Sequence, residues 1–221
     1  GTFTGAAAFM KEHPSIPFVG VPGTIDNDLF GTDFTIGFDT AVNTAVDAVD
    51  KIRDTADSHN RLFFVEVMGR HSGFIALNTA IAGGAGGILI PEKDYTIDDV
   101  VKSLKKGVSR HKLFSIIIVA EGSKLGNASE IAEKVKAAYS HYDTRVAIIG
   151  HLQRGGSPTF QDRVLASRLG FAAVEALMDG KKGIMIGLTN DEISHTPFAD
   201  AISKMKPLSK ELLNLGYVLS L

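Results

Sequence analysis

The sequence lacks cysteine and tryptophan altogether, and it has almost no excess of either charge, with 23 Lys and Arg against 25 Asp and Glu. The absence of cysteine excludes disulfides, thiolate metal sites and a cysteine nucleophile, and it fits a reducing compartment. A net charge of −2 argues against a broad basic surface for nucleic acid. No window approaches the roughly 18 to 20 consecutive apolar residues of a membrane span. Because no secretory or transit signature opens the chain, we expect a cytoplasmic protein without a membrane or nucleic-acid partner.

Apolar residues make up 44% of the 221 positions, which is ordinary for a globular protein. Short branched-chain runs, typical of buried parallel strands, cover 16–21, 62–67, 87–90, 113–120, 146–149 and 184–188. Helical patterns lie between them at 6–12, 42–52, 74–82, 97–109, 129–139 and 158–179, the last opened by Pro158. This alternation predicts an α/β fold with doubly wound, mostly parallel sheets and flanking helices.

The first residues form a glycine-rich stretch, 1–5, with no initiating Met. It resembles the second half of a strand–turn–helix unit whose strand would precede Gly1. We therefore expect the chain to be a fragment that lacks the N-terminal part of a longer protein.

Polar clusters follow the predicted strands, at 23–28, 68–71, 121 and 151–157. Ligands of such sheets bind at the carboxyl ends of the strands. The first cluster places Asp26 and Asp28 two residues apart, so in an extended turn both carboxylates face one side. They fit a general base and a Mg²⁺ ligand. An Asx turn that caps backbone amides explains the same residues equally well.

The other clusters suit a phosphorylated sugar. Arg70 offers a planar fork for phosphate oxygens, and the helix opened by Gly73 favours an anion at its N-terminus. His151 and Arg154, just past a strand end, suit a phosphomonoester. Glu121 can accept hydrogen bonds from sugar hydroxyls. The plainer alternatives are a surface arginine, a core histidine, and a carboxylate that caps a helix or forms a salt bridge.

Three segments together, 22–28, 68–70 and 145–163, resemble the 6-phosphofructokinase family in order, spacing and position at the strand ends. The resemblance implies phosphoryl transfer from ATP to the 1-hydroxyl of fructose 6-phosphate. It makes Asp26 the general base and places Arg70 and Thr24 at the reaction centre. The sugar phosphate would also contact Ile25, Met68, Gly69, Glu121, His151, Leu152, Gln153 and Arg154.

The same resemblance implies a nucleotide site and an oligomer. Gly1, Thr2 and Gly5 would belong to the nucleotide loop, Asp28 would help hold Mg²⁺, and the main metal-binding Asp would lie upstream, so the fragment alone is expected to be inactive. Arg61 and Arg145 would reach the 6-phosphate from a neighbouring subunit of a homotetramer. Arg145 as a structural arginine, paired with Asp143 or Glu175, is the alternative.

The resemblance also suggests how the chain is divided. Residues 1–35 and 150–185 would form the nucleotide side, 36–149 the sugar-phosphate side, and 186–221 a C-terminal helical segment. Arg53, Arg110 and Lys112 correspond to basic residues of a nucleotide effector site, but an acidic residue of that site is replaced by Gly86, so a solvated basic face explains them equally well.

The phosphoryl donor is expected to be ATP because Gly1 and Gly23 lack the Asp and Lys that pyrophosphate-dependent relatives carry there. A pyrophosphate-dependent enzyme is the first alternative. A non-catalytic sugar-phosphate-binding subunit of the same fold is the second, although Asp26 and Arg70, which such a subunit would lose, are both present.

Overall fold

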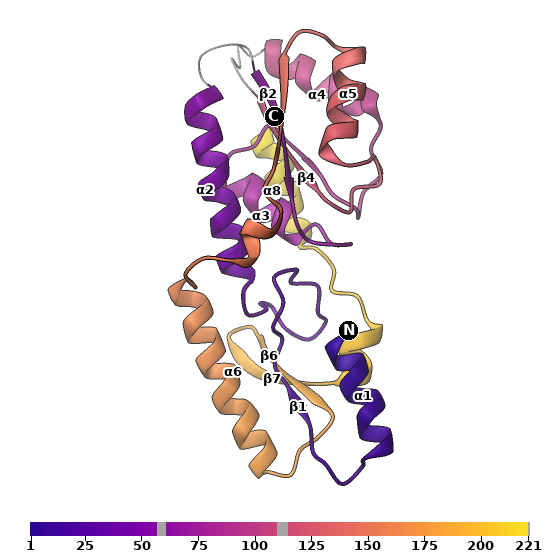
Figure 1. The fold of residues 1–221 in the computed structure, drawn as a ribbon, viewed down its shortest axis with the longest axis vertical. Helices are drawn as coiled ribbons and strands as arrows, with labels where there is room; N and C mark the ends of the chain where they lie inside the picture. The colour runs from indigo at the N-terminus through magenta and orange to yellow at the C-terminus, as the bar shows by residue number, and fades with distance from the viewer. Residues whose placement is uncertain (57–60, 110–114, 221) are drawn as a thin grey trace. The chain divides into compact units, whose positions relative to one another are not determined.

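The computed structural model describes residues 1–56, 61–109 and 115–220, and the chain divides into two compact units (Figure 1). Unit 1 comprises Gly1–Asp39 and Ser157–Pro207, and unit 2 comprises Thr40–Gly156 and Leu208–Leu221. Within the described ranges, no helix is both long and apolar enough to cross a membrane.

Unit 1 is built on a sheet with the order β1-β6-β7, in which β6 is parallel to β1 and antiparallel to β7. Its elements are α1 (Thr2–Glu12), β1 (Val19–Gly20), α6 (Phe160–Met178), β6 (Ile184–Thr189), β7 (Glu192–Pro197) and α7 (Phe198–Ser203). Successive side chains of a strand point to opposite faces. Ile186 and Leu188 of β6 accordingly pack with α6, whereas Met185 packs with α1 and α7. Helices therefore cover both faces, as α6 and α1 show in Figure 1.

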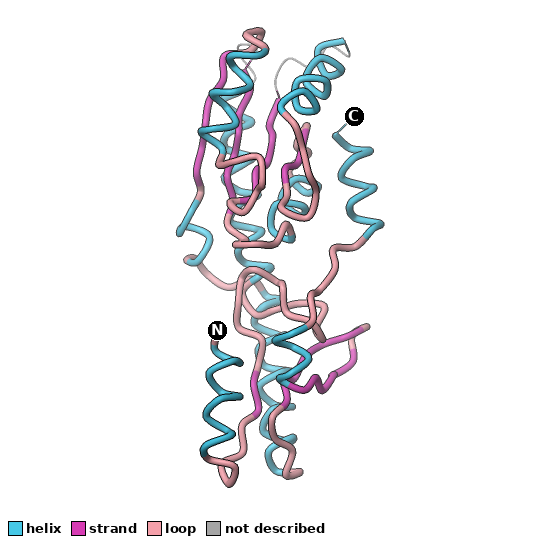
Figure 2. The backbone as a smooth tube through the Cα atoms, turned by 90° about the vertical axis from the view of Figure 1, so that its right-hand side faces the viewer, coloured by secondary structure: helices cyan, strands magenta, loops and turns pink. Residues whose placement is uncertain are grey.

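Unit 2 contains a fully parallel sheet with the order β3-β4-β2-β5. Its elements are α2 (Phe38–Ala56, begun in unit 1), β2 (Arg61–Val67), α3 (Phe74–Ala82), β3 (Gly87–Leu89), α4 (Ile97–Ser109), β4 (Ser115–Ala120), α5 (Ala128–Ala138), β5 (Asp143–Ile148), the 3₁₀ helix η1 (Gly150–Arg154) and α8 (Lys210–Ser220). Leu89 of β3 packs into a core with α4 and α5, while its neighbour Ile88 meets Gly216 of α8. The sheet is covered on both faces, and Figure 2 shows α8 running to the C-terminus alongside it.

The α/β class with mostly parallel sheets and helices on both faces is confirmed, but three expectations about elements are wrong. The strand expected at 16–21 is reduced to β1, because Ile16 is exposed and Pro17 has no N–H for a ladder. The glycine-rich turn at 1–5 is the first turn of α1, in which the Gly5 N–H donates to the Gly1 carbonyl at 3.0 Å. Helix α6 is capped by the hydroxyl of Thr159, so it begins after Pro158 rather than at it.

The expected helical segment 186–221 also differs from the structure. Most of β6, all of β7, and the helices α7 and α8 lie there, and α8 belongs to unit 2 rather than to unit 1. Strand β7 lacks a continuous apolar run and is mostly exposed, because it lies at the edge of its sheet. Which unit faces the nucleotide and which the sugar phosphate stays a prediction.

Candidate active site

The turn after β2, residues 68–73, has a backbone that most side chains do not adopt. Gly69 has a φ of 145° and Arg70 a φ of 54°. Positive φ is uncommon for a residue with a Cβ, so the surroundings must hold Arg70 in this conformation. The Arg70 side chain is exposed, as a phosphate-binding arginine needs to be.

Side chains that follow β4 and β5, the two strands that flank β2, hold the first half of this turn. Glu121, directly after β4, accepts the backbone N–H groups of Gly69 at 3.2 Å and Arg70 at 2.7 Å through Oε1. Gln153 of η1, after β5, accepts the Met68 N–H at 2.8 Å. A Cβ on Gly122 would overlap the Arg70 carbonyl, so the β4 loop packs directly on the turn.

These contacts give a structural role to two residues predicted to bind the substrate. Gln153 is only 1% exposed and supports the turn from inside the protein, and the substrate contact predicted for it stays a prediction. Glu121 is exposed, and it neither caps a helix nor forms an ion pair in these contacts. Both hydrogen bonds end on Oε1, and the carboxylate remains at the surface beside Arg70.

The N-terminus of α3 does attract an anion, as the sequence predicts, but a side chain of the protein supplies it. Glu92, in the loop after β3, accepts the Gly73 N–H at 2.7 Å. The sequence analysis missed Glu92, although it follows a predicted strand just as Glu121 does. Its position at a strand end was the available signal.

The predicted phosphate-binding residues of η1 lie at the surface. His151, Leu152 and Arg154 are all exposed, and Leu152 retains 74% of its surface. They follow β5 at the same sheet edge as Arg70, which follows the adjacent β2. This edge therefore carries an imidazole and two guanidinium groups.

Arg61 and Arg145 lie at the opposite end of the sheet. Arg61 begins β2 and stands opposite Asp143, the first residue of β5. Arg145 pairs with Asp143, with Nη2 at 2.8 Å and Nε at 3.1 Å from Oδ2. This ion pair is the structural alternative considered for Arg145, and both partners are exposed. Within one chain Arg61 is separated from His151 by the length of β5, and Arg145 by the second half of that strand.

The loop that carries Asp26 belongs to unit 1, and hydrogen bonds of Asn27, Thr35 and Thr24 hold it. Asn27, 3% exposed with a φ of 52°, accepts the Thr35 N–H at 3.0 Å. The Thr35 hydroxyl donates to the Thr24 carbonyl at 2.6 Å, and the Thr24 hydroxyl accepts the Asp26 N–H at 3.2 Å. The Asx interpretation therefore applies to Asn27. Asp26 and Ile25 are half-buried, and Asp28 is exposed.

A buried carboxylate that the sequence analysis missed closes the other end of this loop. Asp162 of α6 is 3% exposed and accepts the Gly37 N–H at 2.8 Å. The sequence offered no signal for it beyond its place in the first turn of a predicted helix.

Lys206 is a further missed residue near Asp28. Its Nζ donates to the Asp33 carbonyl at 2.7 Å. Burial lowers the pKa of Lys206 to about 8, against the attraction of Asp33 and Asp28. Among the described residues, no three His, Asp or Glu side chains gather to hold a metal ion. Asp28 fits an ion carried mainly by phosphates and water, which is how Mg²⁺ commonly binds.

The predicted nucleotide residues lie at the start of α1. Gly1 is its N-cap residue, and Gly1, Thr2 and Gly5 are all exposed. Among the residues that the structure describes, no side chain caps this end of the helix, and free backbone N–H groups at a helix N-terminus favour phosphate.

The predicted effector residues are only partly described. Arg110 and Lys112 lie outside the described residues, and Arg53 contacts Asp50, with Nη1 at 3.3 Å from Oδ1. Gly86 leaves little room for the acidic residue that it replaces, because a Cβ there would lie 2.6 Å from the Ser115 hydroxyl.

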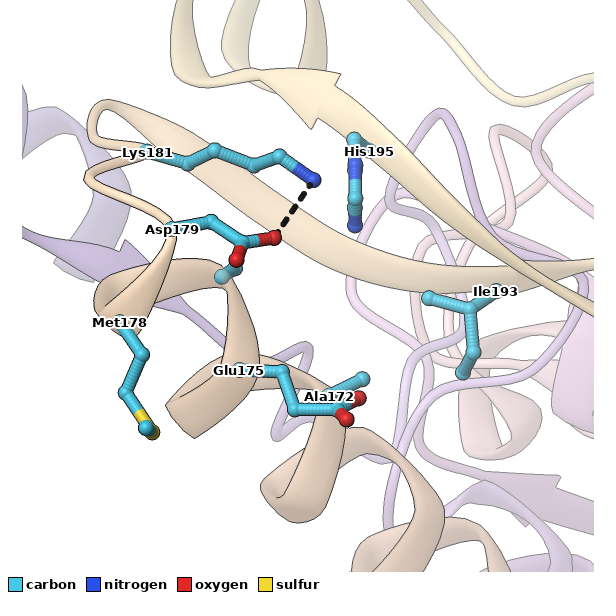
Figure 3. Close-up of a pocket in the computed structure, with 8 residues that line it drawn as sticks. Ala172, Glu175, Met178, Asp179, Lys181, Ile193 and His195 are labelled. Carbon is cyan, nitrogen blue, oxygen red and sulfur yellow. Dashed lines mark ion pairs between the residues drawn. The ribbon is translucent and has the colours of Figure 1, made fainter.

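A cavity of about 460 Å³ in unit 1 contains none of the predicted site residues. Figure 3 shows it between α6 and the β6–β7 hairpin, lined by Ala172, Glu175, Ala176, Met178, Asp179, Lys181, Ile193 and His195. Lys181 and Asp179 lie 3.7 Å apart at its rim. The cavity is thus a separate feature of the α6 face.

Known proteins are similar to this chain in sequence and in fold over its whole length. Residues 1–177 match the family described as Phosphofructokinase. The chain is 55% identical to ATP-dependent 6-phosphofructokinase 2 of Bacteroides thetaiotaomicron over 221 residues, which is 100% of this chain and 68% of that protein. All of it superimposes on 33% of the phosphofructokinase chain from Saccharomyces cerevisiae, with a TM-score of 0.86 and 31% identity. A pyrophosphate-dependent phosphofructokinase from Marinobacter aquaeolei gives a TM-score of 0.79 at 25% identity, over 99% of this chain and 64% of that one. The chain belongs to the phosphofructokinase family.

Proposed function

We propose that this protein transfers the γ-phosphoryl group of ATP to the 1-hydroxyl of fructose 6-phosphate, giving fructose 1,6-bisphosphate and ADP. The observation that carries the proposal is the Arg70 turn, whose backbone is held by Glu121 and which places an exposed arginine at the sheet edge that it shares with His151 and Arg154. The name of the Bacteroides relative, which is 55% identical, supplies the reaction.

Asp26 accepts the proton of the 1-hydroxyl while the hydroxyl oxygen attacks the γ-phosphorus of ATP. The bond between that phosphorus and the bridging oxygen breaks, and ADP leaves. Arg70 and Thr24 face the transferred phosphoryl group, where a fixed guanidinium stabilises developing negative charge. Ile25, Met68 and Gly69 line the sugar.

The sugar phosphate is held at the sheet edge of unit 2. His151 and Arg154 bind the 6-phosphate, with Leu152 beside them. Glu121 accepts a hydrogen bond from a sugar hydroxyl at the exposed part of its carboxylate, while Oε1 of the same carboxylate holds the turn. One carboxylate thereby couples the position of the sugar to the position of Arg70.

The nucleotide lies at the N-terminus of α1, with Gly1, Thr2 and Gly5 at its phosphates. Among the described residues, Asp28 would help hold a Mg²⁺ ion, which would neutralise phosphate charge on the nucleotide. Because the chain spans 68% of the length of its Bacteroides relative, we propose that residues beyond these 221 complete the nucleotide site, and that the chain alone does not turn over.

Arg61 and Arg145 act on the 6-phosphate of a second copy in a homo-oligomer, for which we propose a tetramer. Two features support this. Both arginines lie at the wrong end of the sheet to reach His151 in their own chain, and β5 is an edge strand with exposed Val146 and Ile148.

ATP is favoured over pyrophosphate as the donor by the space beside two glycines. A Cβ at Gly1 or Gly23 would meet nothing within 4 Å, so packing does not impose glycine at either position. The fold alone does not choose, because a pyrophosphate-dependent enzyme superimposes on the same chain.

The decisive experiment uses a chimera in which these 221 residues replace the matching segment of the Bacteroides relative. Turnover of fructose 6-phosphate is measured with ATP and with pyrophosphate as donors. We expect rapid turnover with ATP alone. Equal rates with pyrophosphate would overturn the choice of donor, and sugar-phosphate binding without turnover would favour a non-catalytic subunit.

A further inference from the structure

The loop after β3 presents Glu92 to the second half of the Arg70 turn. Its Oε1 accepts the Gly73 N–H at 2.7 Å. A Cβ on Gly73 would lie 2.7 Å from Glu92 Oε2 and 2.6 Å from Ile90 Cγ2. The contact therefore requires glycine at the position where the turn passes into α3.

The segment that carries Glu92 is anchored on both of its sides. The Lys93 ammonium lies 4.2 Å from the ring centroid of Tyr217 in α8 and 5.3 Å from that of Tyr95. Asp94 pairs with Lys124 at 2.9 Å. Glu92 is thus presented by a loop fixed to α8 and to the segment that follows β4.

The turn as a whole is held at both ends. Gln153 and Glu121 accept the N–H groups of Met68, Gly69 and Arg70, and Glu92 accepts that of Gly73. Inside the turn, the Ser72 N–H and hydroxyl both donate to the Gly69 carbonyl, at 2.9 Å and 3.0 Å. Three side chains, each from the segment that follows β3, β4 or β5, thus stabilise one strained turn.

We propose that Glu92 is a positioning residue for Arg70, and that through it the enzyme recognises the phosphate on carbon 1 of the sugar. This inference rests on the proposed function. Arg70 has a positive φ, a conformation that costs free energy and persists only where the surroundings impose it. Both ends of its turn must therefore be fixed. A carboxylate at the first turn of α3 also gains from the partial positive charge there. Removing it frees the end of the turn that Glu121 does not hold.

The test compares Glu92→Ala, Glu92→Gln and the control Asp98→Asn, which alters an exposed carboxylate in the first turn of α4, outside this loop. Amide hydrogen exchange is measured at Gly69 and Arg70, whose acceptor is Glu121 rather than Glu92. Calorimetry measures the affinities of the chain for fructose 1,6-bisphosphate and for fructose 6-phosphate. For Glu92→Ala we expect faster exchange at both amides and an affinity for the bisphosphate lowered about tenfold, with less than about a twofold change for the monophosphate. Glu92→Gln, which keeps an acceptor oxygen, is expected to restore most of both properties.

Two outcomes overturn the inference. One is unchanged exchange at Gly69 and Arg70 in Glu92→Ala, which would confine Glu92 to capping α3. The other is an equal loss of affinity for both sugars, which is what a general loss of structure would produce. Failure of the wild-type chain to bind either sugar phosphate would instead count against the proposed function, and the exchange data would still decide whether Glu92 fixes the turn.

Discussion

The carboxylate of Glu121 accepts the backbone N–H of Arg70 at 2.7 Å, across a sequence separation of 51 residues. The acid proposed to bind the sugar therefore also sets the conformation of the arginine proposed to face the transferred phosphate. Because a carboxylate and a carboxamide both present an acceptor oxygen, substitutions can separate the two roles.

Glu121→Ala is expected to lower kcat/KM of the chimera for fructose 6-phosphate on the order of 10²-fold, because a misplaced catalytic group costs about that much. Glu121→Gln keeps the acceptor for the turn and is expected to retain kcat while raising KM. Steady-state kinetics of both variants check this. An unchanged kcat in Glu121→Ala would show that Arg70 keeps its position without this contact.

Asp26→Asn is expected to reduce kcat by about 10²- to 10⁴-fold with little change in KM for the sugar, since the loss of a general base has effects of that size. The measurement is steady-state turnover in the chimera, with melting temperature as a check on folding. A raised KM with normal kcat would remove Asp26 from the role of base.

Asn27→Ala is expected to lower the stability of the protein, whereas Asp26→Asn is expected to lower kcat. Asn27 is buried, has a positive φ and accepts the Thr35 N–H, so alanine leaves a buried donor unpaired in a strained backbone. We expect a loss of about 1–3 kcal/mol in the free energy of unfolding, measured with urea. Equal stability of Asn27→Ala and wild type would mean that the loop is held elsewhere.

The sequence predicted which residues meet at the sheet edge, because the carboxyl ends of parallel strands fall together. It did not predict that Gln153 and Glu121 hold the backbone of the Arg70 turn. Gln153 lies 85 residues from Met68, and only the register of β2 against β5 shows that it points inward to the turn. Lys206 and β7 were missed for a different reason. They lie in exposed or irregular segments without apolar periodicity, where tertiary contacts alone decide the structure.

Lys206 is expected to give unit 1 a characteristic pH dependence. Its pKa is lowered from 10.5 to about 8, chiefly by burial. Between these values the unfolded chain binds a proton that the folded chain has lost, so the contribution of Lys206 to stability rises with pH. Relative to Lys206→Met, the wild type is expected to gain up to about 1 kcal/mol per pH unit in this window. Urea unfolding from pH 7 to 10 measures the difference, with the exposed Lys204→Met as matched control. A constant difference would contradict the lowered pKa of the buried Lys206.

Arg145 distinguishes a site shared between copies from a site within one chain. It stands near the start of β5, and His151 follows the end of that strand. Five residues separate the two, and the strand part from Arg145 to Ile148 rises about 10 Å at roughly 3.3 Å per residue. The Arg145 guanidinium pairs with Asp143 at the start of the strand, away from His151, so the two side chains do not hold one phosphate within a chain. If Arg145 binds substrate, it does so in another copy.

Mixed oligomers of the chimera test this directly. Arg145→Ser and His151→Ala are each expected to bind fructose 6-phosphate weakly. A hybrid site can take its arginine from one parent and its histidine from the other, so mixing the two after dissociation is expected to restore part of the activity and of the sugar affinity. Asp143→Asn is the matched control, because it breaks the ion pair of Arg145 but leaves its guanidinium in place. If mixed oligomers form and show no more activity than either parent, Arg145 is a structural residue whose partner is Asp143, and the site lies within one chain.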